Sequence, residues 1–274
     1  MAQTDGPGQK GLRGIGRDAS MTQLCRTVLK TMLGDHADLR VQPHPGLLLS
    51  MGLDVFPEGE KAGEIKRKHI ERLCRTTASD FYRDAFSRWK SLTQDVRRFA
   101  VLEARIQGRL YIGTTRDTPL ETGITVHHTY GMPMIPGSSV KGLCRSQSDS
   151  IADKEVVEYL FGNDWGEKDE AAVISGGIVY HDAWWVPEGQ PFVSEVVTVH
   201  HQEYYGSCGE TPATDFDSPI PAPQIATQGK FYFVIEGPQA WAELARHLLR
   251  QALEHQGIGG KRSSGYGYLN VFLK

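Results

Sequence analysis

The spacing of apolar residues predicts helices in four parts of the chain. Leu24, Val28 and Met32 recur at i, i+4 and i+8, the period of a helix with one buried face. Stripes of similar period predict one or two helices over residues 65–92, and a short helix over 154–161 that ends at Gly162. A longer helix is predicted to begin at Gly237-Pro238 and to end before Gly257, because Pro and Gly are typical of these two boundaries.

Alternating apolar and polar residues predict strands in the second half of the chain. Over residues 104–112, Ile106, Gly108, Leu110 and Ile112 share one face, and the other face carries Arg105, Gln107, Arg109 and Tyr111. Further strands are predicted over 176–183, 192–200, 229–236 and 266–272. The order strand, helix, strand, strand, extra strand, helix, strand favours an α+β fold with a ferredoxin/RRM-like core.

The patterns divide the chain into three regions. We expect a disordered, basic, Gly-rich tail over residues 1–19, a mainly helical region over 20–100, and the RRM-like core over 101–274. Polar, turn-rich insertions over 113–136 and 201–224 interrupt the core, and loops of this length are commonly functional. Before the core, the apolar run Leu47-Leu48-Leu49 reads as either a buried strand or a docking surface.

Composition narrows the possible classes of protein. The 274 residues are 39% hydrophobic and contain no apolar run near the ~20 residues that span a bilayer, so we expect a cytoplasmic chain with no membrane partner. The cysteines Cys25, Cys74, Cys144 and Cys208 form no C-x-x-C pair, which argues against structural zinc. The net charge of −3 argues against a dedicated nucleic-acid binder and predicts weak RNA binding by the isolated chain.

The segment from Tyr130 to Arg145 has the features of an anion site. Pro133 and Pro136 favour extended backbone, and Gly137, Ser138 and Ser139 then supply residues typical of a helix start. We expect the serine hydroxyls to cap the first turn and Val140, Leu143 and Cys144 to face the core. Lys141 and Arg145 lie four residues apart on another face. Free N–H groups and two cations suit phosphate, although a simple helix cap would look the same.

A second segment, Gly257–Gly267, is rich in glycine and carries Lys261 and Arg262 at its centre. Gly259 and Gly260 allow bare backbone to approach an anion. The segment is not a P-loop, because the first glycine of that motif is replaced by His255 and the flanking order is helix to strand. A helix-to-strand connector with C-cap glycines is the alternative.

Together, the motifs PMIPGSSVKGLCR (133–145) and GIGGKRSSGYG (257–267) resemble the RAMP superfamily of CRISPR-associated RNA-binding proteins. Residues 45–49, 121–131 and 200–205 further resemble the subunit family that is the sixth component of the type III-B (Cmr) effector complex. The resemblance implies a ferredoxin-like core and RNA contacts by the two segments, namely by Gly137, Ser138, Ser139, Lys141, Arg145, Gly259, Gly260, Lys261 and Arg262.

Aromatic and histidine residues in the two insertions are candidates for base contacts. His127, His128 and Tyr130 in the first insertion and Tyr204 in the second could stack on splayed bases, or could pack locally instead. A metal site built from these histidines, His200, His201 and Asp215 would match no known ligand spacing, so we expect no metal and no cofactor.

Catalysis is the alternative function. In related backbone subunits an aspartate of the corresponding insertion cleaves target RNA, and here Glu121 stands at about that place, with Asp117 just upstream. A carboxylate near the scissile phosphate could assist attack by a 2′-hydroxyl or hold a metal. The same glutamate could instead pair with Arg116 or Arg109.

The resemblance implies a non-catalytic, RNA-binding structural subunit that caps the backbone filament of a type III-B CRISPR ribonucleoprotein in antiviral defence. Its expected partners are the 3′ side of the guide RNA (crRNA), the target RNA, other RAMP backbone subunits and the small helical subunit. A protein scaffold without RNA contact is a third possibility.

Overall fold

The computed structural model describes residues 43–53, 55, 57, 59–114, 120, 123–148, 153–163, 175–199, 204, 206–214 and 220–272. The predicted tail and the predicted helix over 21–33 lie outside these residues. In the described part of the N-terminal region, the elements are helices α2 (Pro45–Met51), α3 (Ala62–Cys74) and α4 (Asp80–Leu92) and the short 3-10 turn η1 (Gly59–Lys61).

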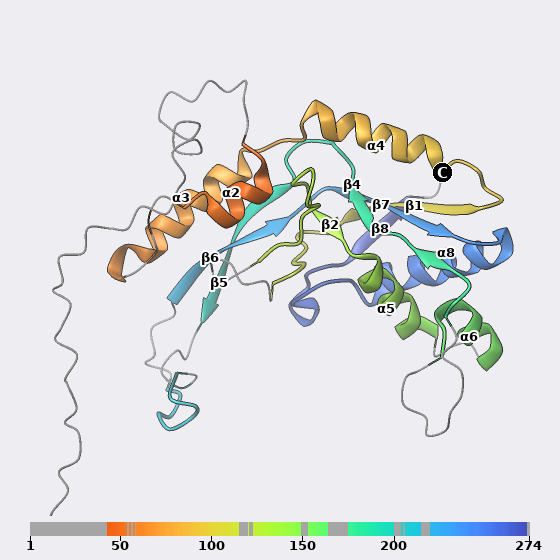
Figure 1. Cartoon of the computed structure of the whole chain (residues 1–274). Coiled ribbons are helices and arrows are strands. Elements are labelled where there is room, and N and C mark those ends of the chain that lie inside the picture. Colours follow the sequence, from red (N-terminus) through yellow and green to blue (C-terminus); the bar gives the residue numbers. More distant parts are fainter. Residues whose placement is uncertain are drawn as a thin grey trace, which may run out of the picture.

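An antiparallel sheet forms the centre of the molecule (Figure 1). Its strand order is β2 (Met134–Ile135), β4 (Ala183–Trp185), β7 (Lys230–Glu236), β1 (Phe99–Ile106) and β8 (Leu269–Phe272), and β3 (Val179–Tyr180) also pairs with β7. Helix α5 (Gly137–Gln147) connects β1 to the β3–β4 pair, and α8 (Gln239–His255) connects β7 to β8. This order is the ferredoxin-like arrangement, so the predicted fold class is confirmed.

Both faces of the central strand β7 are covered, which explains why it is apolar at successive positions. Phe231, Phe233 and Ile235 belong to the main core with α5 and α8, whereas Tyr232 and Val234 point to the opposite face. On that second face they pack against α4, which Figure 1 shows on the far side of the sheet from α5. The sheet is therefore the middle layer of three over β7.

A two-stranded sheet of β5 (Phe192–Val199) and β6 (Ile220–Thr227) extends from this core and contacts α3. The sequence predicted β5, but the first part of β6 falls in the insertion predicted over 201–224, where Pro221 and Pro223 argue against a strand. Thr227 donates its N–H to Leu110, on the side away from β5, and alternation directs the nitrogens of both prolines to that same side. The β5–β6 ladder therefore loses no hydrogen bond to proline.

The structure confirms some of the predicted helix and strand boundaries and corrects others. Two helices occupy residues 65–92 as predicted, and α6 (Lys154–Phe161) ends at Gly162. The alternative of a strand at Leu47-Leu48-Leu49 is wrong, because these residues lie in α2. The His44 side chain caps the first turn of this helix. The predicted strand over 104–112 begins five residues earlier, at Phe99, and stops at Ile106 before the turn at Gly108. The strand predicted over 176–183 is split into β3 and β4.

Candidate nucleic-acid interface

Helix α5 begins at Gly137 as predicted, but its first turn is capped differently. The Gly137 N–H donates to the Asp182 carboxylate at 2.7 Å, and no side chain of the N-cap residue contributes. A Cβ at Gly137 would collide with the Tyr180 carbonyl oxygen, so this glycine is required for packing against the turn after β3. The expected serine cap is wrong, and a carboxylate takes one of the N–H groups that were assigned to phosphate.

The polar residues of α5 differ in their solvent exposure and in their contacts within the protein. Ser138 is exposed, while Ser139, Lys141 and Arg145 are half-buried. Arg145 donates to the Gly162 carbonyl oxygen at 3.4 Å and so links α5 to the end of α6. Lys141 makes no ion pair with any residue that the structure describes. The predicted core residues Val140, Leu143 and Cys144 are buried, which confirms the orientation of the helix.

The Gly-rich loop after α8 is fixed by backbone hydrogen bonds to the segment that follows β1. The Gly260 N–H donates to the Tyr111 carbonyl at 2.7 Å, and the Gly267 N–H donates to the Arg109 carbonyl at 3.0 Å. Gly259 has φ +89°, and a Cβ there would collide with the Tyr111 carbonyl oxygen. The loop therefore requires glycine where it lies against this neighbouring segment.

Lys261 and Arg262 stand on the exposed part of this loop. Lys261 is itself in the left-handed region, at φ +58°, and begins the 3-10 turn η3 (Arg262–Ser264). Its ammonium lies 5.6 Å from the centre of the Tyr111 ring. Neither cation has a carboxylate partner among the residues resolved here, so both are available to an anion.

Tyr111 is the centre of a polar and aromatic cluster beside the loop. Its ring meets Tyr266 edge to face at 4.9 Å and is 1% exposed. The Tyr111 hydroxyl, Arg109 Nε and Gln224 Oε1 are all buried without a hydrogen-bond partner in the described chain. Arg109 Nε reaches only to 3.8 Å from Glu195. Burial also raises the pKa of Tyr111, so the hydroxyl stays protonated.

We did not predict this cluster from the sequence, although the sequence contains a pattern that indicates it. Arg109 and Tyr111 fall on the polar face of the alternating pattern over residues 104–112. Their position beside the Gly-rich loop depends on a contact between segments about 150 residues apart.

The two predicted segments meet at one end. Gln256, directly before the Gly-rich loop, bonds to Ser146 at 2.6 Å and to Gln147 at 2.7 Å, both at the C-terminal end of α5. Lys141 is five residues from Ser146, which is about 8 Å along the helix axis. The structure thus joins the loop to α5 at the end of the helix opposite to Gly137.

The aromatic candidates divide into packed and exposed groups. His127 and Tyr130 are half-buried in a cluster with Trp184, at ring distances of 5.1 and 5.6 Å, and Tyr130 also meets Phe81 of α4 at 5.1 Å. Burial lowers the pKa of His127, which favours the neutral ring. Local packing therefore accounts for these two residues. By contrast, His128 and Tyr204 are exposed.

The candidate catalytic residues Glu121 and Asp117 lie outside the described residues, as do His200, His201 and Asp215. Within the described ranges, no group of three or more His, Cys, Asp or Glu side chains has a metal-binding arrangement. No helix in those ranges is long and apolar enough to cross a membrane.

Comparisons with known proteins agree with the fold. The RAMP superfamily model matches residues 103–270. The chain is 24% identical to "CRISPR system Cmr subunit Cmr6" of Pyrococcus furiosus, over 62% of this chain and 67% of the relative. It is also 24% identical to the Cmr6 subunit of Saccharolobus solfataricus, over 77% of this chain and 72% of the relative.

Among solved structures, a chain in "Cryo-EM structure of the Type III-B Cmr-beta bound to cognate target RNA" shares the fold. Its TM-score is 0.62 with 20% identity, and the match covers 78% of this chain and 73% of that one. Because the family model spans more than half of the sequence, from within β1 to within β8, this chain belongs to the RAMP superfamily.

Proposed function

We propose that this chain is a non-catalytic, RNA-binding subunit of a type III-B CRISPR effector complex. In this role it caps the backbone filament, contacts the 3′ side of the guide RNA and the target RNA, and adjoins RAMP subunits and the small helical subunit. The names of the relatives support the assignment to such a complex. The observation that supports RNA contact is the exposed pair Lys261 and Arg262, on a Gly-rich loop that backbone hydrogen bonds hold against Arg109 and Tyr111.

The loop suits a single-stranded polyanion for three reasons. Its two cations lack carboxylate partners in the described chain, so binding a phosphate breaks no ion pair of theirs. At Gly265 nothing lies within 4 Å of the place of a Cβ, which leaves room for a strand to approach the backbone. The Tyr111 ring, which packs on Tyr266, lies 5.6 Å from the Lys261 ammonium and helps to position this cation. Lys141 on α5, which makes no ion pair with a described residue, is a further cation that the first motif offers.

The proposal is tested with the double variant Lys261→Ala/Arg262→Ala in the assembled complex. Removing two phosphate contacts from single-stranded RNA should make the slope of log K against log salt shallower by about 1.4. Guide RNA per purified complex should also fall, regardless of guide sequence. Lys141→Ala should act in the same direction with about half the change in slope.

The control is Arg67→Ala/Lys68→Ala, which removes two adjacent exposed cations from α3. Both control residues pair within the helix, with Glu71 and Glu64 at 2.6 Å. The control should leave the salt slope unchanged. Equal guide occupancy and equal salt slopes for the loop variant and the wild-type chain would overturn the proposal.

A further inference from the structure

Exposed apolar side chains gather on the helices α2 and α4. Leu47 and Met51, one turn apart on α2, are 48% and 43% exposed. Phe81, in the first turn of α4, is 60% exposed. A single exposed apolar residue is ordinary, but three large side chains in one area form a surface that a partner can bury. We call these three residues the α2–α4 patch.

One turn of the chain holds the two parts of this patch together. The Tyr130 ring lies 5.1 Å from the Phe81 ring. The next residue, Gly131, lies so close to the start of α2 that a Cβ would come within 2.7 Å of the Pro45 ring. The Gly131 N–H donates to the His127 carbonyl at 2.7 Å, which closes the turn. The two helices therefore present their exposed side chains on adjoining parts of one surface.

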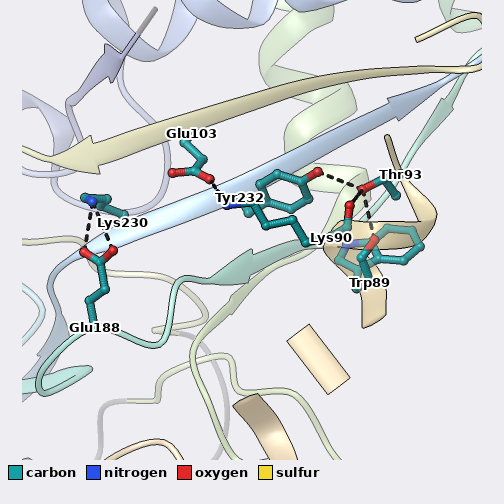
Figure 2. Close-up of polar contacts among 7 residues, drawn as sticks. All are labelled: Trp89, Lys90, Thr93, Glu103, Glu188, Lys230 and Tyr232. Atoms are coloured by element: carbon teal, nitrogen blue, oxygen red, sulfur yellow. Dashed lines mark hydrogen bonds and ion pairs between the residues drawn. The ribbon is translucent and has the colours of Figure 1, made fainter. Parts of the chain in front are cut away.

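Helix α4 is fixed on the sheet, so the exposure of Phe81 does not result from a loosely held helix. Near its C-terminal end, the Thr93 hydroxyl meets the Tyr232 hydroxyl at 2.7 Å. Lys90 also reaches the sheet and pairs with Glu103 at 2.7 Å, as Figure 2 shows. Phe81 is thus held in place at the other end of the same helix while most of its ring surface meets solvent.

The segment of residues 21–33, which lies outside the described residues, has the pattern of a helix that needs such a surface. Its apolar stripe consists of Leu24, Val28 and Met32. At 3.6 residues per turn, Arg26 and Lys30 fall on the opposite side, about 160° from the centre of the stripe. A helix this short is only marginally stable in water by itself, so its stability depends on packing of the apolar stripe.

Chain connectivity brings this segment to the patch. Only residues 34–42 separate it from Pro43, which leads directly into α2. The chain from Leu33 to Pro43 can reach at most roughly 35 Å. Because the patch begins on α2 itself, it is the first apolar surface that the segment can meet. A short tether also gives an effective concentration in the millimolar range, so a weak intrinsic affinity is enough for docking.

Charge around the patch favours this polypeptide over RNA. Asp80 and Asp84 are exposed on α4 next to the patch, and neither makes an ion pair with a described residue. Two free carboxylates repel a phosphate strand. Residues 21–33 contain Arg26 and Lys30 and no acidic residue, so their charge is complementary to this surface.

We propose that residues 21–33 form a helix that packs its apolar stripe onto the α2–α4 patch of the same chain. The exposed side chains of the patch select the apolar stripe, the short tether selects this segment over other molecules, and the free carboxylates select its positive charge. The inference goes beyond the proposed function, because docking within the chain requires neither RNA nor another subunit.

Hydrogen–deuterium exchange of the full chain, without RNA or other subunits, tests the docking. The amides of residues 21–33 should be protected in the wild-type chain. In the variant Leu47→Glu/Phe81→Glu they should exchange at least tenfold faster, because charge replaces the patch at two exposed positions that the core does not need. The matched control is Val179→Glu/Val196→Glu, at exposed strand positions, which should leave the protection unchanged.

Substitutions in the segment test the same contact from the other side. Leu24→Glu/Val28→Glu should remove the protection, whereas Arg26→Gln/Lys30→Gln, on the opposite side of the helix, should keep it.

A native thiol provides a second measurement, because Cys25 borders the apolar stripe. Alkylation followed by mass spectrometry should show Cys25 reacting at least tenfold more slowly than the exposed Cys208 in the wild-type chain. The two rates should become similar in Leu47→Glu/Phe81→Glu.

Unprotected amides over residues 21–33 in the wild-type chain, or unchanged protection in the patch variant, would overturn the inference. Protection that rises with the concentration of the chain would overturn it too, since the stripe would then bind a second copy. So would protection that is present only in the assembled complex, because a neighbouring subunit would then be the partner. Guide RNA has no part in these measurements, so the inference and the proposed function fail separately.

Discussion

Two buried tyrosines offer a direct test of the polar cluster beside the Gly-rich loop. Tyr82 and Tyr111 are each 1% exposed, so replacement by Phe keeps the packed ring and removes one hydroxyl from each site. The Tyr82 hydroxyl donates to the Trp185 carbonyl oxygen at 2.5 Å, whereas the Tyr111 hydroxyl has no partner in the described chain. The same substitution should therefore have different effects.

The expected magnitudes follow from this difference. Tyr82→Phe loses a buried hydrogen bond and leaves a buried carbonyl without that donor, which costs about 1–3 kcal/mol. For a chain of this size the midpoint of thermal unfolding should fall by roughly 2–5 °C. Tyr111→Phe removes a buried hydroxyl that gains nothing from the protein, so its stability should be equal or higher by up to about 1 kcal/mol.

Urea unfolding followed by circular dichroism measures both variants, provided that the slopes match the wild-type value. RNA anisotropy supplies the second readout, because both hydroxyls are buried and neither can reach an RNA strand at the surface. Both variants should therefore leave RNA binding unchanged, and only the stability of the chain should distinguish them. If Tyr111→Phe destabilises the chain as much as Tyr82→Phe does, the hydroxyl has a structural partner and the reasoning is wrong.

Two further predictions concern the loop and the insertion. Gly259→Ala and Gly265→Ala both place a side chain at positive φ, +89° and +87°, but only the Cβ at Gly259 meets the Tyr111 carbonyl. Gly265→Ala should therefore cost about 1 kcal/mol, and Gly259→Ala clearly more together with loss of RNA affinity; equal costs measured by urea unfolding would contradict the packing argument. Glu121→Gln in the assembled complex should leave every target RNA cleavage site unchanged, and loss of one mapped site would instead identify the chain as an endoribonuclease.

The sequence predicted elements whose signals are local. Helix α6 ends at Gly162, and α8 lies between Pro238 and Gln256, because caps and periodicity are encoded within a few residues. The ferredoxin-like order followed from the sequence of strands and helices. The local signals were misleading in β6, where proline is typical of a loop but is also tolerated in a strand. The nitrogens of its prolines point away from β5, so the ladder keeps its hydrogen bonds.

The parts that could not be predicted depend on contacts distant in sequence. Asp182 takes the first N–H of α5 from 45 residues away, which no pattern around Gly137 indicates. Likewise, the role of Gly259 becomes evident only when the Tyr111 carbonyl is placed against it. A motif can therefore be found correctly while the reason for one of its residues is packing and not ligand contact.

Net charge alone gives a misleading account of this chain, because its cations fall into two groups. On α4, β7 and α8, the cations Lys90, Lys230 and Arg246 each lie in an ion pair with a carboxylate and contribute little field outside the protein. On the Gly-rich loop, Lys261 and Arg262 have no ion pair with a described residue. A protein with a net charge of −3 can thus present a locally positive surface to RNA where its cations are unpaired. Such a division favours RNA contact in which neighbouring subunits add further cations, since two unpaired cations alone give weak binding that salt easily removes.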